Sequence, residues 1–222
     1  ATSNARGFRN EGYELLTTKE VTSFVEGINA DVLLLQEATP KIRKPYFSKP
    51  IKAAGGYEGH HQLRLRTVAT FAKSLKEVDA VFKGYNGFVV SDVETELGTI
   101  RFVNAHLQSN RISGLASKIG TNKDVEKELD RAESMFRRYG KTARKRAAQA
   151  EDIRRFIQDS PHPVILAGDF NDVPSSFIYE RLLTPRLRDA WVEAGFGLGT
   201  TFTGPLPGLR IDFMLVDTSL SV

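Results

Sequence analysis

The stretch VILAGDFNDVPSS, residues 164–176, runs an apolar segment straight into Gly-Asp-Phe-Asn and then into two serines. Val, Ile and Leu favour a buried strand, and a serine that follows a turn is typical of a helix N-terminus. The segment therefore predicts a strand, a sharp turn and a short helix. Asp169 and Asn171 lie in the turn, where such side chains either make a local hydrogen bond to the backbone or act on a bound molecule.

The composition is that of a globular protein. The chain has 222 residues, of which 41% are hydrophobic and 26% are charged, and this length suits one domain with a sizeable core. No stretch approaches the roughly 18 consecutive apolar residues of a membrane span, so we expect no transmembrane segment. The absence of cysteine excludes disulfides and thiolate chemistry. We expect a monomer, and the sequence leaves the cellular location open.

Helical and strand patterns are mixed along the chain. Thr17 and Glu20 form a capping box ahead of apolar residues at helical spacing, which predicts a helix over 17–29. The run DVLLLQE, residues 31–37, predicts a strand buried on both faces. Further predicted strands, rich in β-branched and aromatic residues, are VATFAKS (68–74), GFVVSDVE (87–94), TIRFVNAHLQ (99–108) and RIDFMLV (210–216).

Other features follow from local patterns. Residues 122–159 have a helical pattern, which we expect Gly140 to divide into two helices. His60 and His61 are expected in a surface loop, and Trp191 in the core. No linker or repeat is present, so we expect a single domain over residues 1–222. Because the sequence begins without Met and ends directly after a predicted strand, we expect this domain to be clipped at both ends.

Basic residues gather in one part of the chain. Residues 111–155 hold 13 Lys and Arg against seven Asp and Glu, a net charge of +6, whereas the rest of the chain sums to −2. Within that region, residues 137–146 (RRYGKTARKR) hold six basic residues and no acidic one. Such a run is either a solvated face or a surface for an anionic partner, which would be a nucleic acid or a lipid head group.

Several predicted strands end in a polar residue suited to metal or phosphate chemistry. These residues are Asn4, Gln36, Glu37, His106, Asp169, Asn171 and Asp212. Sheet enzymes gather catalytic groups at strand ends, because the strands fix them while loops give access. A carboxylate such as that of Glu37 is a hard oxygen ligand that suits Mg²⁺. The lack of cysteine and of a histidine pair at helical spacing argues against a zinc site.

Five of these segments resemble, in order, the motifs of the endonuclease/exonuclease/phosphatase superfamily, the DNase-I-like fold. They are TSNARGF (2–8), LLLQE (33–37), VNAHLQS (103–109), LAGDFNDVP (166–174) and RIDFM (210–214). The resemblance implies an α+β fold, a four-layered α/β/β/α sandwich with the site at one edge of its two sheets. It also implies hydrolysis of a phosphate ester with a divalent metal, Mg²⁺ in most members, with Mn²⁺ as the alternative.

The resemblance assigns metal and phosphate contacts. Glu37 matches the metal-binding glutamate of the family, and Gln36 is its structural neighbour. Asn4 matches the asparagine of the first strand, which lies beside the metal and the phosphate. Asn171 matches the asparagine that holds a phosphate oxygen.

The catalytic groups are implied in the same way. Asp169 matches the aspartate that aligns or deprotonates the attacking water, and His106 matches a phosphate contact or leaving-group acid. Asp212 matches the aspartate that orients a final catalytic histidine. The family normally carries that histidine in a Ser-Asp-His motif after the RID strand, and no histidine follows Asp212 in these 222 residues.

The sequence therefore predicts a Mg²⁺-dependent phosphoesterase that cleaves a phosphodiester by in-line attack of water. Nucleic acid is the favoured substrate, with a phospholipid head group or an inositol phosphate as alternatives. A second hypothesis is a catalytically silent homologue that binds phosphate-rich ligands without turnover. The two hypotheses differ in whether a divalent metal supports hydrolysis.

Overall fold

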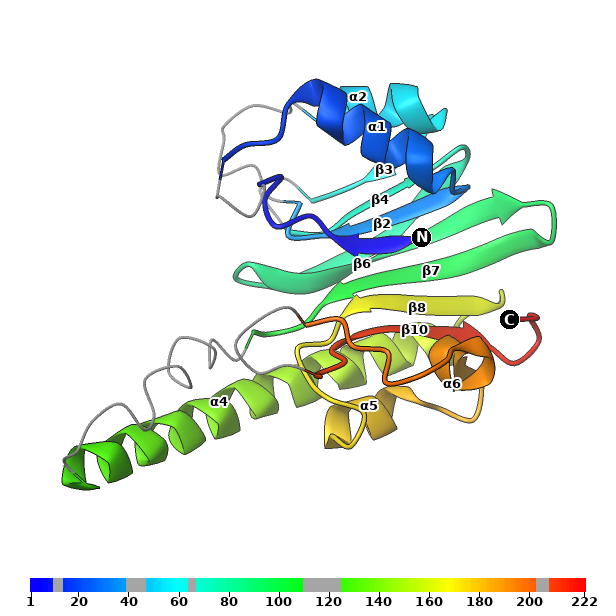
Figure 1. Cartoon of the computed structure of the whole chain (residues 1–222). Helices are drawn as coiled ribbons and strands as arrows, with labels where there is room; N and C mark the ends of the chain where they lie inside the picture. The colour runs from blue at the N-terminus through cyan, green and yellow to red at the C-terminus, as the bar shows by residue number, and fades with distance from the viewer. Residues whose placement is uncertain (10–13, 39–46, 64–66, 110–124, 203–207) are drawn as a thin grey trace.

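The computed structural model describes residues 1–9, 14–38, 47–63, 67–109, 125–202 and 208–222. Within this part of the chain, two sheets and five helices form an α+β fold (Figure 1). The smaller sheet has the order β1-β2-β4-β3, and its strands are β1 (Thr2–Asn4), β2 (Val32–Gln36), β3 (Gly59–His61) and β4 (Ala69–Ala72).

The larger sheet has the order β5-β6-β7-β8-β10-β9. Its strands are β5 (Leu75–Lys83), β6 (Asn86–Thr95), β7 (Gly98–His106), β8 (Val164–Asp169), β9 (Leu187–Asp189) and β10 (Asp212–Asp217). Strands β7 and β8 run parallel, and β10 lies antiparallel to β8. The helix α4 connects the two parallel strands, as a crossover between parallel strands requires.

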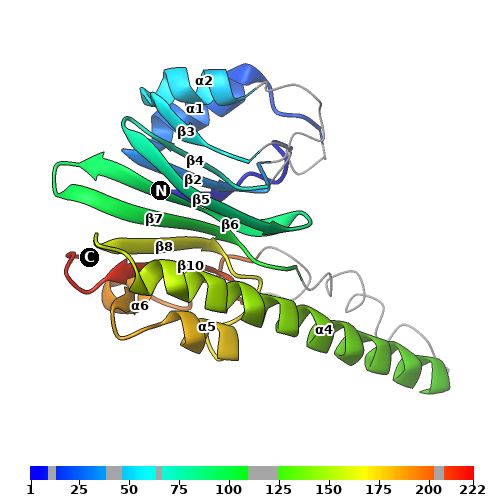
Figure 2. The same cartoon turned by 180° about the vertical axis from the view of Figure 1, so that it is seen from behind.

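The elements form four layers, as predicted, and each interface between layers has its own apolar core. Helices α1 (Thr18–Ile28) and α2 (Ser48–Gly55) cover the outer face of the smaller sheet (Figures 1 and 2). Helices α4 (Val125–Gln158) and α5 (Phe177–Leu182) cover the outer face of the larger sheet. The two sheets pack face to face around a third core, which includes Leu34, Phe102 and Ala167.

Strand β2 shows how the sequence pattern produces this packing. Its five residues are all buried, which confirms the prediction of a strand covered on both faces. Leu33 and Leu35 pack toward α1 and α2, whereas Val32 and Leu34 pack toward the larger sheet. The continuous apolar run is therefore explained by a strand with a protein layer on each side.

Helix α1 begins and ends where its capping signals predict. The Thr17 hydroxyl accepts a hydrogen bond from the Glu20 N–H, and the Glu20 carboxylate accepts one from the Thr17 N–H. The helix ends at Asn29, whose left-handed backbone (φ 45°) closes the last turn. Ser176 likewise caps α5, by accepting a hydrogen bond from the Tyr179 N–H.

The expected division of helix α4 at Gly140 is wrong, since the helix runs unbroken through that residue. A glycine within a helix costs only about 1 kcal/mol relative to alanine, which the packing of the C-terminal half of α4 offsets. No helix in the described part of the chain combines the length and hydropathy needed to cross a membrane.

Two further expectations are corrected. His60 and His61 both lie in β3 rather than in a surface loop, and His61 is buried there with its Nδ1 2.9 Å from the Ser91 hydroxyl. Trp191 is 40% exposed rather than buried in the core. It lies in the short helix α6 (Ala190–Ala194), which packs at the side of β10 and β9.

Candidate active site

The predicted site residues at the strand ends point into the space between the two sheets. Side chains alternate between the faces of a strand. In β8, Leu166 packs toward the helices and Ala167 packs between the sheets, so Asp169 also faces the space between the sheets. The same alternation applies to Asn4, Gln36, His106 and Asp212, each two residues from a side chain that lies between the sheets.

Strand pairing places three of these residues side by side at one end of the larger sheet. In the parallel pair β7 and β8, His106 is in register with Asp169. In the antiparallel pair β8 and β10, Asp169 is in register with Asp212. The end of β7, the end of β8 and the start of β10 therefore meet at the same edge, although His106 and Asp212 are 106 positions apart in the chain.

Contacts across the edge involve both sheets. The Asn4 amide, at the end of β1, donates to Asp169 Oδ2 at 3.4 Å. His106 Nε2 lies 3.8 Å from the same oxygen, and its Nδ1 lies 3.4 Å from the Thr67 hydroxyl. Asp169 is only 5% exposed, so these groups surround most of its carboxylate.

The turn after β8 contains the local hydrogen bond expected of an Asp-x-Asn turn. The Asn171 N–H donates to Asp169 Oδ1 at 2.8 Å, which leaves Oδ2 directed toward Asn4 and His106. The Asn171 side-chain amide donates to the Leu107 carbonyl oxygen at 2.9 Å and so ties this turn to the end of β7. The local turn and a functional role are thus compatible, because Oδ1 accepts the hydrogen bond of the turn and Oδ2 faces the site.

Glycine at position 168 is required by the close approach of β7. Its φ of 138° is one that other residues rarely adopt. A Cβ at Gly168 would lie 2.0 Å from the Ala105 carbonyl oxygen. The glycine of the Gly-Asp-Phe-Asn segment therefore allows Asp169 to be held beside the end of β7.

Glu37 follows β2 directly and has a left-handed backbone with φ 49°. Such a conformation is uncommon for residues other than glycine and is found at functional sites, where the surrounding structure holds it. Here the Gly7 N–H donates to the Glu37 carbonyl oxygen at 2.8 Å, and the Ala38 N–H donates to the Thr67 carbonyl oxygen at 2.8 Å. These bonds fix Glu37 between the loops that follow β1 and precede β4.

The three carboxylates at this edge repel one another. The pKa of Asp169 is raised to about 8, chiefly by burial and then by the negative charges of Asp212 and Glu37, while the hydrogen bonds from Asn171 and Asn4 oppose the rise. Burial also raises the pKa of Asp212. A hydrogen bond with Thr201 lowers this pKa, and the negative charge of Glu37 raises it. Glu37 is therefore close enough to act on both aspartates, so the site concentrates negative charge.

His106 is held in its neutral form by its surroundings. Burial lowers the pKa of its imidazole, and the charge of Glu37 opposes this effect. A neutral imidazole has one nitrogen that donates and one that accepts a hydrogen bond. His106 can therefore present a donor to an oxygen atom at the site edge while its other nitrogen faces Thr67.

A polar layer lies directly beneath the site. The Gln36 amide donates to Asn104 Oδ1 at 2.7 Å and so links the two sheets. The Asn104 amide in turn donates to the Ala69 carbonyl oxygen at 3.0 Å and to the Thr70 hydroxyl at 3.3 Å. Gln36 and Asn104 are fully buried, which explains why each is satisfied within the protein. Asn104 was visible in the sequence as a polar residue within the apolar run of β7.

A buried arginine of α4 supports the loops at the site. Arg146 is fully buried, and its Nε donates to Asp172 Oδ2 at 3.0 Å. Its Nη1 donates to the Gln108 carbonyl oxygen at 3.1 Å. The Gln149 side chain accepts a hydrogen bond from the Gln108 N–H at 2.9 Å. The helix thus holds the residues that follow His106 and those that follow Asp169. Sequence reasoning placed Arg146 only in a basic run.

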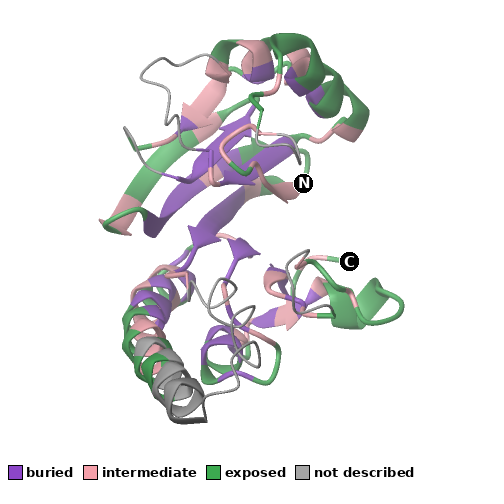
Figure 3. Ribbon diagram, turned by 60° about the vertical axis from the view of Figure 1, so that its left-hand side comes forward, coloured by how far each residue is buried: buried purple, intermediate pink, exposed green. Residues whose placement is uncertain are grey.

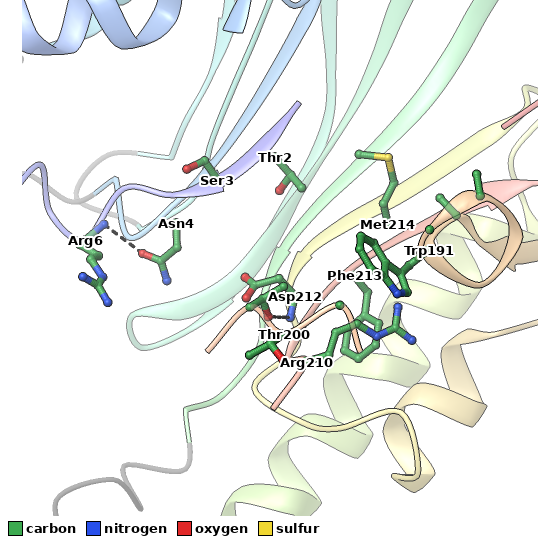
Figure 4. A pocket seen from close by; sticks show the side chains of 15 residues that line it. Thr2, Ser3, Asn4, Arg6, Trp191, Thr200, Arg210, Asp212, Phe213 and Met214 are labelled. Carbon is green, nitrogen blue, oxygen red and sulfur yellow. Dashed lines mark hydrogen bonds between the residues drawn. The ribbon is translucent and has the colours of Figure 1, made fainter. Parts of the chain in front are cut away.

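A cavity of about 830 Å³ opens beside this edge (Figure 4). Asn4 from β1 and Asp212 from β10 face it from opposite sheets, and Trp191 and Met214 line it further along. Thr201 also lines it, and its hydroxyl accepts hydrogen bonds from the Ile211 and Asp212 N–H groups at 3.0 and 3.1 Å. Asn4 and Asp212 are therefore accessible to a bound molecule.

The residues at this edge suit a hard divalent cation. The facing groups are carboxylate and amide oxygens, which Mg²⁺ and Mn²⁺ prefer, and a cation would relieve the repulsion among the buried carboxylates. Among the described residues, no three His, Cys, Asp or Glu side chains are grouped closely enough to hold a metal by themselves. Mg²⁺ keeps several water ligands and needs only one or two protein carboxylates.

The sequence matches the family model described as "Endonuclease/Exonuclease/phosphatase family" over residues 1–222. The chain belongs to this family. Members of the endonuclease/exonuclease/phosphatase family are phosphoesterases that typically use divalent metals. No curated protein matched the sequence in a direct comparison.

Solved structures share the family fold at low sequence identity. A humanized TDP2 of D. rerio superimposes with a TM-score of 0.64 at 16% identity and covers 97% of this chain and 81% of its own. Sphingomyelinase C from Streptomyces griseocarneus gives 0.61 at 16% identity, with coverage of 100% and 84%. A beta toxin from Staphylococcus aureus gives 0.58 at 13% identity, with coverage of 98% and 84%. The predicted DNase-I-like fold is confirmed.

Proposed function

We propose that this chain is a phosphodiesterase that uses Mg²⁺, or Mn²⁺ in its place, to hydrolyse a phosphodiester by in-line attack of water. The observation that carries the proposal is the meeting of Glu37, Asp169 and Asp212 at one edge, where their charges act on one another. A buried group of like charges destabilises the fold, and such groups are found preferentially at sites that bind a metal or transfer protons.

Glu37 is the proposed metal ligand, with Asn4 beside it. The bound cation would neutralise the charge that develops on the phosphate oxygens. The position of Glu37 supports this role, since two loops hold its strained backbone and its charge reaches both aspartates.

Asp169 is the proposed general base. Its Oδ2 faces Asn4 and His106, so a water at this oxygen would lie beside both side chains. Asp169 would orient that water and accept its proton as the oxygen attacks phosphorus. The Asn171 hydrogen bond to Oδ1 keeps the carboxylate in a fixed orientation for this task.

His106 and Asn171 are the proposed contacts to the non-bridging phosphate oxygens, together with Asn4. As an alternative role, His106 in its protonated form would donate a proton to the leaving oxygen, and the negative charge of Glu37 favours that protonated form. Asp212, in register with Asp169, is the proposed orienting group for a donor to the phosphate. Preorganised donors of this kind stabilise the transition state because they need not reorient as charge develops.

Removal of the metal tests the proposal. We expect the chain to hydrolyse bis(p-nitrophenyl) phosphate in Mg²⁺ or Mn²⁺, to stop in EDTA and to recover when the metal is restored, as followed by p-nitrophenol absorbance. Turnover that persists in EDTA would refute the metal role. Binding of phosphate esters with no metal-dependent turnover would instead identify a catalytically silent binding module.

The substrate class is proposed to be nucleic acid. The similar structures include a sphingomyelinase C, so a phospholipid is the alternative to be compared. Supercoiled DNA, sphingomyelin and phosphoinositides, each supplied with Mg²⁺, separate the classes directly. We expect turnover of DNA to exceed that of the lipids.

A further inference from the structure

Helix α4 is longer than the sheet that it covers. Its C-terminal half packs on the larger sheet through Ala150, Ile153 and Ile157. Its N-terminal half extends beyond the sandwich, on the side where the site edge lies (Figures 1 and 3). None of residues 139–145 is buried, and Arg146 is the first buried residue among the described side chains of α4. The helix therefore leaves the body of the protein beside the candidate site.

The projecting part is basic. We call Arg137, Lys141, Arg144 and Lys145 the basic arm, and all four are exposed. The other three lie four, seven and eight residues after Arg137, which puts all four along one side of a helix. Residues 134–150 contain no acidic residue, so the charge of the arm is not balanced within its own stretch of helix. Within the arm, Arg137 forms an ion pair with Glu133 at 2.5 Å.

The arm is joined rigidly to the site. Arg146 follows Lys145 directly and is bound to Asp172 and to the Gln108 carbonyl oxygen, in the loops that carry the site. A helix rises by about 1.5 Å per residue, so Lys141 lies about 7.5 Å along the axis from Arg146. The arm therefore begins beside the loops that carry the site, so a polymer bound at the site could extend along it.

We propose that the basic arm binds the phosphate backbone of a nucleic acid and so holds the polymer across the site. This inference rests on the proposed function and names the partner of the same site. Lysine and arginine that neutralise phosphates release condensed counterions, which supplies affinity without sequence preference. A lipid surface with anionic head groups is the other partner that such a charge could bind, and the test below compares it with nucleic acid.

The test compares two double variants that remove the same charge. Lys141→Ala/Lys145→Ala removes two members of the arm. Lys73→Ala/Lys76→Ala removes two exposed lysines near the start of β5, at the opposite end of the sheet. Alanine is a strong helix former, so the first pair leaves α4 intact. Binding of a short fluorescent DNA duplex is measured by anisotropy in EDTA as the salt concentration rises.

We expect the arm variant to bind DNA at least about tenfold more weakly at low salt, and its log–log salt slope to fall by about two. The β5 variant is expected to bind as the wild type does. Equal affinity of the arm variant and the wild type would overturn the inference, as would wild-type protein that binds vesicles of phosphatidylcholine and phosphatidylserine but not DNA. If the wild type did not hydrolyse bis(p-nitrophenyl) phosphate in Mg²⁺ or Mn²⁺, that result would instead count against the proposed function.

Discussion

Replacement of Asp169 by Asn is expected to lower kcat for phosphodiester hydrolysis by at least about a hundredfold. Asparagine keeps the size of the side chain and can still accept the Asn171 hydrogen bond at one atom, but it cannot take a proton from water. The loss should fall on kcat and persist at saturating Mg²⁺, because the proposed role is proton transfer. Initial rates with bis(p-nitrophenyl) phosphate over a range of Mg²⁺ concentrations measure it.

Stability provides the control for this variant. The pKa of Asp169 is about 8 in the folded state against an ordinary value of 3.8, so its ionisation costs stability as the pH rises between these values. At pH 8 the wild type bears this cost and Asp169→Asn does not. In metal-free buffer the variant should therefore unfold at a temperature no lower than that of the wild type. Asp159→Asn, an exposed change at the far end of α4, should keep full activity, and wild-type turnover by Asp169→Asn would refute the role.

Replacement of Glu37 by Gln is expected to lower kcat/KM by at least about a hundredfold at a Mg²⁺ concentration that saturates the wild type. The amide retains a neutral oxygen but loses the charge that holds a hard cation. In contrast to Asp169→Asn, this variant should regain part of its activity as Mg²⁺ is raised. The metal concentration at half-maximal rate is the measurement that distinguishes the two roles.

A matched change isolates the effect of position. Glu58 is exposed next to the start of β3, and β3 begins at the end of the smaller sheet away from the site. Glu58→Gln removes the same charge and should leave the metal dependence unchanged. If Glu37→Gln and Glu58→Gln had the same Mg²⁺ requirement as the wild type, Glu37 would not be the metal ligand.

Features that depend only on neighbouring residues were predictable from the sequence. The capping box of Thr17 and the apolar run of β2 each need only a few neighbouring residues, and both predictions are confirmed. The Gly140 prediction failed because the local cost of glycine is small beside the packing of α4 against the sheet. His61 was misplaced for a similar reason, since the burial of β3 comes from strands distant in the chain.

The candidate site was predictable only in part. Residue types and the resemblance pointed to His106, Asp169 and Asp212, but their juxtaposition depends on the pairing register of β7, β8 and β10. Register is a property of the folded sheet and cannot be derived from any one segment. Arg146 illustrates the same limit, since its basic neighbours are exposed and only the fold reveals that this member of the run is buried beneath the site.

Binding of Mn²⁺ to crystals of the wild-type chain, located by anomalous scattering, tests most directly whether these distant segments form one cation site. We expect a single strong peak bonded to the Glu37 carboxylate, on the side that faces Asn4, Asp169 and Asp212. A peak bonded elsewhere, or none at this edge under conditions in which Mn²⁺ supports turnover, would contradict the proposed site.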